Sequence, residues 1–150
     1  MIVDSGNRQE FPSGAVRDMR AGKGRCDLVP LDVLTKLMDC YEHDTVLPYL
    51  ALYAEEKTTH NLYGALIEFA HLAFQDSVET MVLEVAKHFE DGCEKYGEDN
   101  WRKGVPEWCY LDSAIRHYLK WRRGDNDERH DRAFVWNLMC CCWEVDYHHD

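Results

Sequence analysis

Apolar side chains recur along most of this chain at intervals of three and four residues, the spacing that gathers them on one face of an α-helix. The most regular stripe consists of Val78, Met81, Val82, Val85, Ala86 and Phe89. Asp76 or Ser77 is suited to cap the start of this helix, because these side chains accept hydrogen bonds from free backbone N–H groups. Gly97 is suited to end it. The pattern therefore predicts a long helix that ends near Tyr96.

Five further segments show helical patterns. The first begins at Pro30 and carries Leu31, Leu34, Leu37 and Met38 on one face. The others cover about residues 47–56, 62–74 and 108–121, with a last helix that starts at 125–127 and runs to about 145. No strand-like alternation of useful length occurs, and short connections between helices favour antiparallel neighbours. The expected fold class is all-α.

Residues 1–28 are rich in Gly, Arg, Lys and Asp and lack a sustained apolar period, so an extended arm or ordered loop is expected there. A chain of 150 residues fits one domain with a workable core. We therefore expect a single all-α domain over residues 1–150. Short helices with many apolar stripes bury some of them against a second copy, which predicts a homo-oligomer, either a dimer or a tetramer.

The formal net charge of −11 argues against a nucleic-acid-binding module, which normally presents a basic face. No stretch approaches the roughly 20 apolar residues of a membrane span, and no signal peptide opens the chain, so a cytoplasmic location is expected. The seven cysteines follow no CxxC metal spacing. Cys140, Cys141 and Cys142 stand in an apolar run, which is typical of thiols packed as small hydrophobes in a reducing compartment.

Carboxylates cluster in the second half of the chain. Glu90 and Glu94 are four residues apart, so they project from one face of the predicted helix. Like charges at that spacing repel each other mildly, and a cation between them relieves the repulsion. For such a pair alone, a solvated acidic face is the simpler explanation.

Asp112 stands in the apolar stretch WCYLDSAI, where a charge is costly to bury unless it is paired or bound to a metal. Arg116 follows four residues later, so an intrahelical salt bridge is the alternative explanation. His117 lies on the neighbouring edge of the same helix, where it can donate a hydrogen bond to a phosphate or a carboxylate.

Acids also crowd the expected start of the last helix, at Asp125, Asp127, Glu128 and Asp131. His130 and Asn137 lie seven residues apart on one face of that helix. Short loops place these helices side by side, so the acids and imidazoles can converge on one spot. Acids repel one another unless a cation lies between them, and Mg²⁺ and Mn²⁺ are the usual candidates. The sequence thus indicates a divalent-metal site for a phosphate-bearing ligand.

The N-terminal arm supplies positive charge. Its basic side chains are Arg17, Arg20, Lys23 and Arg25, and they stand among glycines that allow the backbone to approach an anion closely. The segment GKGR is no Walker loop, because it lacks the upstream glycine and the trailing Ser or Thr. A flexible basic arm is the alternative. Trp101 beside Lys103 offers stacking for a base, or else packs into the core.

Four segments together resemble a known family: GAVRDMRAGKGRCDLVP, EDGCEKYGEDNWRKGVP, LDSAIRHYLKW and RHDRAFVWN. They are similar to the phage and prophage dATP/dGTP diphosphohydrolases, which are in turn similar to the MazG-like all-α nucleoside-triphosphate pyrophosphohydrolases. The resemblance covers roughly residues 11–38 and 82–140. Its most specific part is KYG-x-x-NW-x-KG followed by D-S-A-x-R-H.

The resemblance implies a MazG-like helical bundle that cleaves a purine deoxynucleoside triphosphate, dATP or dGTP, into the monophosphate and pyrophosphate with Mg²⁺ or Mn²⁺. A phage-encoded enzyme of this kind would act in the host cytoplasm. The implied metal ligands are Glu90, Glu94 and Asp112, with Asp131 as a further candidate. The implied phosphate contacts are Lys23, Arg25, Arg116 and His117. His130 and Asn137 also match the family pattern as substrate-binding candidates, and Asn100 and Trp101 are candidates for contact with sugar or base.

The chain departs from this pattern in places. Residues 41–78 have no counterpart that we can place, so they are a possible insertion. Asp131 stands where the family has an apolar residue. MazG-like enzymes usually carry acid pairs spaced Glu-x-x-Glu and Glu-x-x-Asp, whereas three residues separate Glu90 from Glu94, and Glu128 with Asp131 fits the second pair by spacing only.

Two other functions stay open at this point. One is a non-catalytic nucleotide sensor on the same scaffold, although a sensor need not keep acids that bind metals. The other is a helical interaction protein whose acids form only a solvated face. Stabilisation by added metal would distinguish the last class, because a ligand that binds the folded state alone raises its stability.

Overall fold

The computed structural model describes residues 4–148, so the first three residues of the predicted arm and the last two of the chain lie outside it. A short hairpin opens this range, with β1 over Arg8–Glu10 and β2 over Val16–Asp18. The helices follow in the order η1 Cys26–Leu28, α1 Leu31–Tyr41, α2 Leu47–Glu56, α3 Thr59–Ala73, α4 Val78–Tyr96, η2 Asn100–Lys103, α5 Glu107–Arg123 and α6 His130–Tyr147. The all-α prediction is confirmed, and α4 starts and ends where the apolar stripe predicts.

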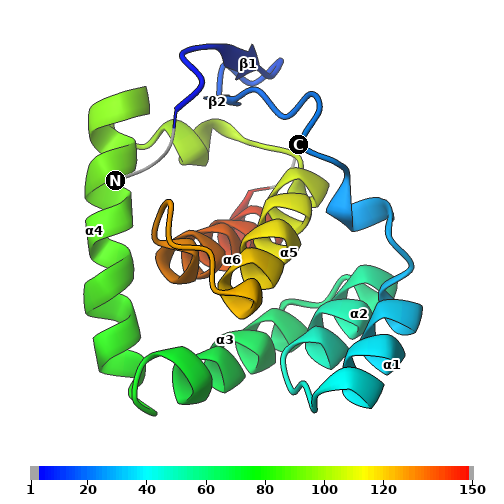
Figure 1. The fold of residues 1–150 in the computed structure, drawn as a ribbon. Helices are drawn as coiled ribbons and strands as arrows, with labels where there is room; N and C mark the ends of the chain where they lie inside the picture. The colour runs from blue at the N-terminus through cyan, green and yellow to red at the C-terminus, as the bar shows by residue number, and fades with distance from the viewer. Residues whose placement is uncertain (1–3, 149–150) are drawn as a thin grey trace.

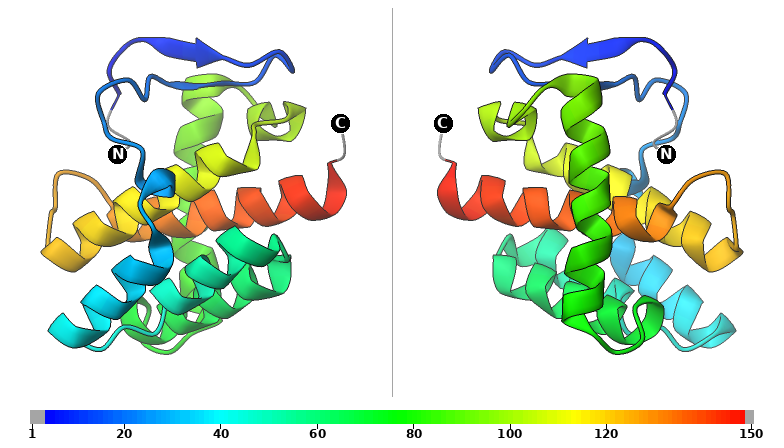
Figure 2. Two further views of the ribbon diagram at one scale, coloured as in Figure 1. Left: turned by 90° about the vertical axis from the view of Figure 1, so that its right-hand side faces the viewer. Right: turned by 90° about the vertical axis from the view of Figure 1, so that its left-hand side faces the viewer.

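Helices α5 and α6 form the centre of the molecule and pack against each other along their length (Figure 1). Helix α4 crosses them on one side, and α1, α2 and α3 form a layer below them (Figure 2). The hairpin lies at the opposite end from α1–α3. The core is rich in aromatic rings, and Phe69 of α3 contacts both Tyr118 of α5 and Phe134 of α6. These three rings are fully buried and join the three helices that carry them.

The ends of α4 follow the expected capping chemistry. The Ser77 hydroxyl accepts a hydrogen bond from the backbone N–H of Thr80 at 3.0 Å. Gly97 follows the last residue with φ of 91°, a backbone conformation that L side chains rarely adopt. Ser77 rather than Asp76 is therefore the cap.

The last helix starts later than predicted, at His130 instead of 125–127. Gly124 ends α5 in the left-handed conformation, and the backbone N–H groups of Gly124 and Asp125 satisfy carbonyls of the last turn of α5. The carboxylate of Asp125 then pairs with Arg123 rather than capping α6. The acids at 125–128 consequently lie in the loop between α5 and α6, and not at the start of the last helix as the sequence pattern predicted.

The N-terminal arm is ordered against the helices and contains the only strands in the described part of the chain. β1 and β2 pair antiparallel, with Gln9 opposite Arg17. The buried side chain of Asn100 accepts a hydrogen bond from the N–H of Val16 and donates one to its carbonyl, both at 2.9 Å. Asn100 thus acts as a short extension of the hairpin ladder and fixes β2 above α4 and α5.

The cysteines agree with the packing interpretation. Cys140, Cys141 and Cys142 are buried free thiols in α6, and no disulfide is present among residues 4–148. Burial raises the pKa of Cys141 and of Cys142 to about 12. No helix in the described range is both long and apolar enough to cross a membrane.

Candidate functional site

A cavity of about 280 Å³ lies between the arm and helices α4, α5 and α6. The described side chains that line it include five basic groups, which are Arg17, Arg20, Lys23, Arg116 and Lys120. Four acids also line it: Asp4, Asp18, Asp127 and Glu128. The basic groups of the lining outnumber its acids by one, whereas the whole chain has a net charge of −11. The cavity is therefore much less negative than the rest of the chain, which favours an anionic ligand there over other parts of the surface.

Arg17 reaches from β2 into this cavity. Its Nη2 donates hydrogen bonds to Ser113 Oγ at 3.2 Å and to Asn137 Oδ1 at 3.1 Å, which ties the arm to α5 and α6. The guanidinium also lies over the rings of Tyr110 and Trp136, at 5.1 and 5.6 Å from their centroids. Nη1 is buried and has no hydrogen-bond partner among the described residues. A buried donor of a charged group without a partner is costly, so this N–H is suited to an anionic ligand.

Arg116 and Asp112 form a buried pair on α5. Nη2 of Arg116 donates to both carboxylate oxygens of Asp112, at 2.7 and 2.8 Å, and also to the carbonyl of Gly24. The same carboxylate accepts a hydrogen bond from the N–H of Cys26 at 2.7 Å. Asp112 is completely buried. The pair therefore fastens the end of the arm to α5, as the salt-bridge alternative proposed.

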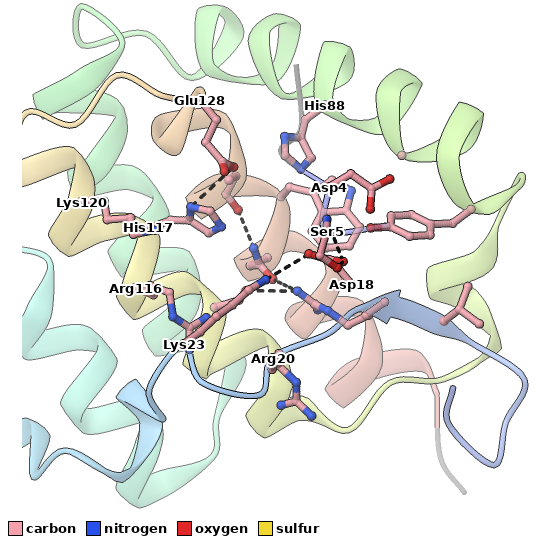
Figure 3. A pocket seen from close by; sticks show the side chains of 18 of the residues that line it. Asp4, Ser5, Asp18, Arg20, Lys23, His88, Arg116, His117, Lys120 and Glu128 are labelled. Atoms are coloured by element: carbon pink, nitrogen blue, oxygen red, sulfur yellow. Dashed lines mark hydrogen bonds and ion pairs between the residues drawn. The ribbon is translucent and has the colours of Figure 1, made fainter. Parts of the chain in front are cut away.

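Lys23 and Asp18 form an ion pair at the mouth of the cavity, with 3.2 Å between Nζ and Oδ2 (Figure 3). Burial raises the pKa of the Asp18 carboxyl, but hydrogen bonds from Ser5 and Lys23 outweigh it and lower the pKa overall. Lys23 is exposed, so the pair is weak and a phosphate group can compete for the ammonium.

Two histidines and two acids meet at the inner end of the cavity, where α5, the following loop and α6 join. His117 Nδ1 lies 4.0 Å from Glu128 Oε1 (Figure 3). It also lies 2.9 Å from Nδ1 of His130. His130 Nε2 lies 2.7 Å from the carboxylate of Asp127 and donates a hydrogen bond to it. The two Nδ1 atoms are also at hydrogen-bond distance, so one of them carries a proton that the other accepts. One ligand atom each from His117, Glu128 and His130 fall within 4.8 Å of one another.

Burial determines the charge of these groups. It is the largest cause lowering the pKa of His117 well below its ordinary value, and the nearby His130 lowers it further. Burial also raises the pKa of the Glu128 carboxyl. His117 is therefore neutral at neutral pH, which is the form that binds a metal.

His88 faces the same cavity from α4 (Figure 3). Its ring lies 5.5 Å from the ring of Trp136, measured between centroids. Burial lowers the pKa of His88 to about 4, so it is a neutral imidazole near pH 7. It can accept a hydrogen bond from a ligand or from water.

The structure does not bring the four predicted metal ligands together. Glu90 and Glu94 have exposed side chains on α4, on a face that does not line the cavity. The carboxylate of Asp112 already accepts hydrogen bonds from Arg116 and from the backbone N–H of Cys26. Asp131 accepts two hydrogen bonds from Arg129, at 2.8 and 2.9 Å, outside the cavity. Metal binding by these four residues stays a prediction.

The predicted substrate-binding residues divide into two groups. Those that line the cavity are Lys23, Asn100, Arg116, His117 and Asn137. Those that do not are Arg25, Trp101 and His130. Arg25 pairs with Asp27 and lies over the ring of Trp108, while His130 contacts the cavity through His117. Trp101 lines a neighbouring cavity instead.

Among the other cavity residues, Arg17, Arg20 and Glu128 were predicted only as members of the basic arm and of the acid cluster, and His88 and Lys120 were not predicted. Three of the four basic residues of the arm, Arg17, Arg20 and Lys23, line the cavity and Arg25 does not, a difference that the sequence pattern does not reveal. His88 lies four residues before Gly92 and eight before Tyr96, on the α4 face that borders the cavity. The site residues on α4 were predicted from carboxylates, and none of these three residues carries one.

The comparison with family models gives one match. The model described as dATP/dGTP diphosphohydrolase, N-terminal, matches residues 65–149. No curated protein and no solved structure matches the chain. The matched range starts inside the segment 41–78 and contains α4, α5, α6 and the loops between them. His88, Arg116 and His117 lie on these helices, and Glu128 lies in the loop between α5 and α6. The arm with Arg17 and Lys23 lies outside the match.

The helices that build the cavity are thus the part of the chain that the family model recognises. The match covers more than half of the 150 residues. This chain belongs to the dATP/dGTP diphosphohydrolase family.

Proposed function

We propose that this protein hydrolyses purine deoxynucleoside triphosphates, dATP or dGTP, to the monophosphate and pyrophosphate with the help of a divalent metal. The name of its family supports a diphosphohydrolase activity. The choice of nucleotide and the dependence on Mg²⁺ or Mn²⁺ are our proposal.

The observation that carries the proposal is the buried Nη1 of Arg17, which has no hydrogen-bond partner among residues 4–148, in a cavity lined by five basic groups. A triphosphate presents several anionic oxygens, and charge-assisted hydrogen bonds to guanidinium groups are among the strongest that proteins make. Arg17 and Arg116 approach the cavity from β2 and α5, and Lys23 and Lys120 can neutralise further phosphate oxygens. Cleavage of a phosphoanhydride depends mainly on such positioning and neutralisation of charge.

The cluster of His117, Glu128 and His130 fits a divalent metal better than the predicted acid set. Two ligand atoms that bind an octahedral metal at right angles, each about 2.1 Å from it, lie about 3 Å apart. The two Nδ1 atoms are 2.9 Å apart, which agrees with that spacing, and a metal would take the place of the proton that they share. The hydrogen bond from His130 to Asp127 is the kind of outer contact that orients a ligating imidazole.

A bound metal would lower the pKa of a coordinated water and neutralise phosphate charge. The chain's own groups hold the substrate around that point. Arg17, Lys23 and Arg116 bind phosphate oxygens, and the neutral His88 accepts a hydrogen bond from water inside the cavity. The imidazole donors favour a transition metal such as Mn²⁺ over Mg²⁺, which prefers oxygen ligands.

A panel of nucleoside triphosphates incubated with Mn²⁺, Mg²⁺ or a chelator, with products separated by chromatography, tests the proposal. We expect pyrophosphate and a monophosphate from dATP or dGTP, no products with the chelator, and faster turnover with Mn²⁺. Orthophosphate and a diphosphate as first products would contradict it. Binding of nucleotide without any turnover would favour the non-catalytic sensor.

We also propose that the protein is a homo-oligomer. The apolar side chains of Ile67 and Leu72 on α3, and of Val82 and Leu83 on α4, are exposed in the single chain. Helix faces of this kind often become buried between subunits. Sedimentation measurements over a range of concentrations would contradict the proposal if they gave a monomer throughout.

A further inference from the structure

A second cavity adjoins the first, which is lined by Arg17, Lys23 and Arg116 and is called the cationic cavity below. It encloses about 210 Å³ between the end of α4, the loop that follows it and Trp136 of α6. Its lining is Phe89, Gly92, Cys93, Tyr96, Gly97, Glu98, Asp99, Asn100, Trp101 and Trp136. Four of these residues also line the cationic cavity: Gly92, Tyr96, Asn100 and Trp136. The two cavities are therefore adjacent.

Aromatic rings form much of the wall of this second cavity. The ring centroid of Phe89 lies 5.8 Å from that of Trp101 and 6.0 Å from that of Trp136. All three rings are only half-buried, although they pack against the core on their other sides. The rings pack against one another in edge-to-face or tilted pairs, and all three also border the cavity. A flat aromatic ligand gains stacking energy in such a place.

Gly92 gives independent support. It lies inside α4, four residues before the last residue of the helix, and glycine inside a helix is about 1 kcal/mol less favourable than alanine. A Cβ atom built at this position would have no heavy atom within 4 Å, so no protein neighbour requires the glycine. The open space that the missing side chain leaves is the border between the two cavities. A glycine here keeps that border clear for a ligand.

The second cavity, called the aromatic cavity below, has acceptors for hydrogen bonds at its rim. Asp99 is paired with Arg102, at 3.3 Å, but Glu98 is exposed and no ion pair engages it among residues 4–148. A carboxylate can accept two parallel N–H bonds from guanine, from its ring N–H and its amino group. Adenine presents only an amino group on the corresponding edge, beside a ring nitrogen that repels a carboxylate.

We propose that the aromatic cavity takes the purine base of the nucleotide whose phosphates lie in the cationic cavity, with Glu98 favouring guanine over adenine. This inference rests on the proposed function, because it assumes that the cationic cavity binds the phosphates. Gly92 then marks the point where the sugar passes between the two cavities.

Calorimetric titration of dGTP and of inorganic tripolyphosphate tests the inference. We compare the wild type with Gly92→Leu, which fills the border, and with Ala86→Leu, an exposed position on α4 outside both cavities. Gly92→Leu should weaken binding of dGTP by at least tenfold, in line with the loss of base stacking. It should weaken binding of tripolyphosphate much less, because Gly92 lines the edge that the two cavities share and carries no group that binds phosphate. Ala86→Leu should change neither.

The outcomes separate the two proposals. An equal loss of both ligands in Gly92→Leu, or no loss of either, would overturn the base site and leave the phosphate site standing. Failure of the wild type to bind tripolyphosphate or dGTP would overturn the proposed function itself. Glu98→Gln, at an exposed position that should not affect folding, provides a second measurement. It should reduce the affinity ratio of dGTP to dATP toward one, and an unchanged ratio would overturn the role of Glu98.

Discussion

Replacing Asp112 with Asn distinguishes a structural ion pair from a metal ligand. The substitution keeps the shape of the side chain and removes its charge. In the structure, Asp112 accepts two hydrogen bonds from Arg116 and one from the backbone of Cys26, and its side chain is fully buried. The guanidinium of Arg116, also buried, would be left without a counter-charge in the variant.

The expected loss of stability follows from that burial. Removing one partner of a buried ion pair typically reduces the free energy of unfolding by about 3–5 kcal/mol. For a domain of this size, 1 kcal/mol corresponds to roughly 2–4 °C in Tm. Asp112→Asn should therefore lower Tm by about 6–20 °C. The contact between the arm and α5 should loosen as well, because the N–H of Cys26 loses its charged acceptor.

Thermal unfolding monitored by circular dichroism measures this effect, with Asp131→Asn as the matched control. Asp131 is paired with Arg129, whose side chain is largely exposed, so removal of its charge should change the stability by less than about 1 kcal/mol. A variant Asp112→Asn that melts within a degree or two of the wild type, yet no longer binds metal, would refute the structural role. It would restore Asp112 as a metal ligand.

Three further predictions follow from the same geometry. Lys23→Ala should weaken binding of tripolyphosphate several-fold while Arg25→Ala does not, because only Lys23 lines the cavity; equal effects in calorimetry would contradict this. Burial lowers the pKa of His88 from about 6.5 to about 4, so its contribution to stability is complete above pH 6.5 and is lost as the pH falls toward 4. That contribution is roughly 3 kcal/mol. In His88→Gln, the free energy of unfolding measured with urea should therefore depend less on pH between 6.5 and 4 than in the wild type, and an equal dependence on pH would contradict this prediction. Native protein should react rapidly with a thiol reagent at Cys40 and Cys93, which are exposed, and rapid labelling of the buried thiols of α6 would show that this helix is open.

The helices could be predicted well because their signals are local. The stripe from Val78 to Phe89, Ser77 and Gly97 together specify α4 without reference to the rest of the chain. The hairpin could not be predicted, since each of its strands has only three residues, and β2 is held partly by Asn100, 84 positions away from Val16. Contacts at such separation leave no periodic trace in the sequence.

The candidate site was predicted in part for a related reason. Arg116, His117 and Asn137 were selected from their patterns, and they do line the cavity. The metal ligands were inferred from carboxylate spacing, which shows that Glu90 and Glu94 share a face but not which face is buried. The later start of α6 moved Glu128 into a loop, where it faces His117.

The most direct test of the proposed function compares release of pyrophosphate from dGTP by the wild type, Glu128→Gln and Glu94→Gln in the presence of Mn²⁺. Both substitutions remove one carboxylate charge, but only Glu128 lines the cavity. We expect Glu128→Gln to lose activity by a factor on the order of hundreds, as when metal-held charge in the transition state is disturbed, and Glu94→Gln to retain nearly all of it. Loss of activity in Glu94→Gln with near-normal release in Glu128→Gln would contradict this assignment and place the metal on the outer face of α4.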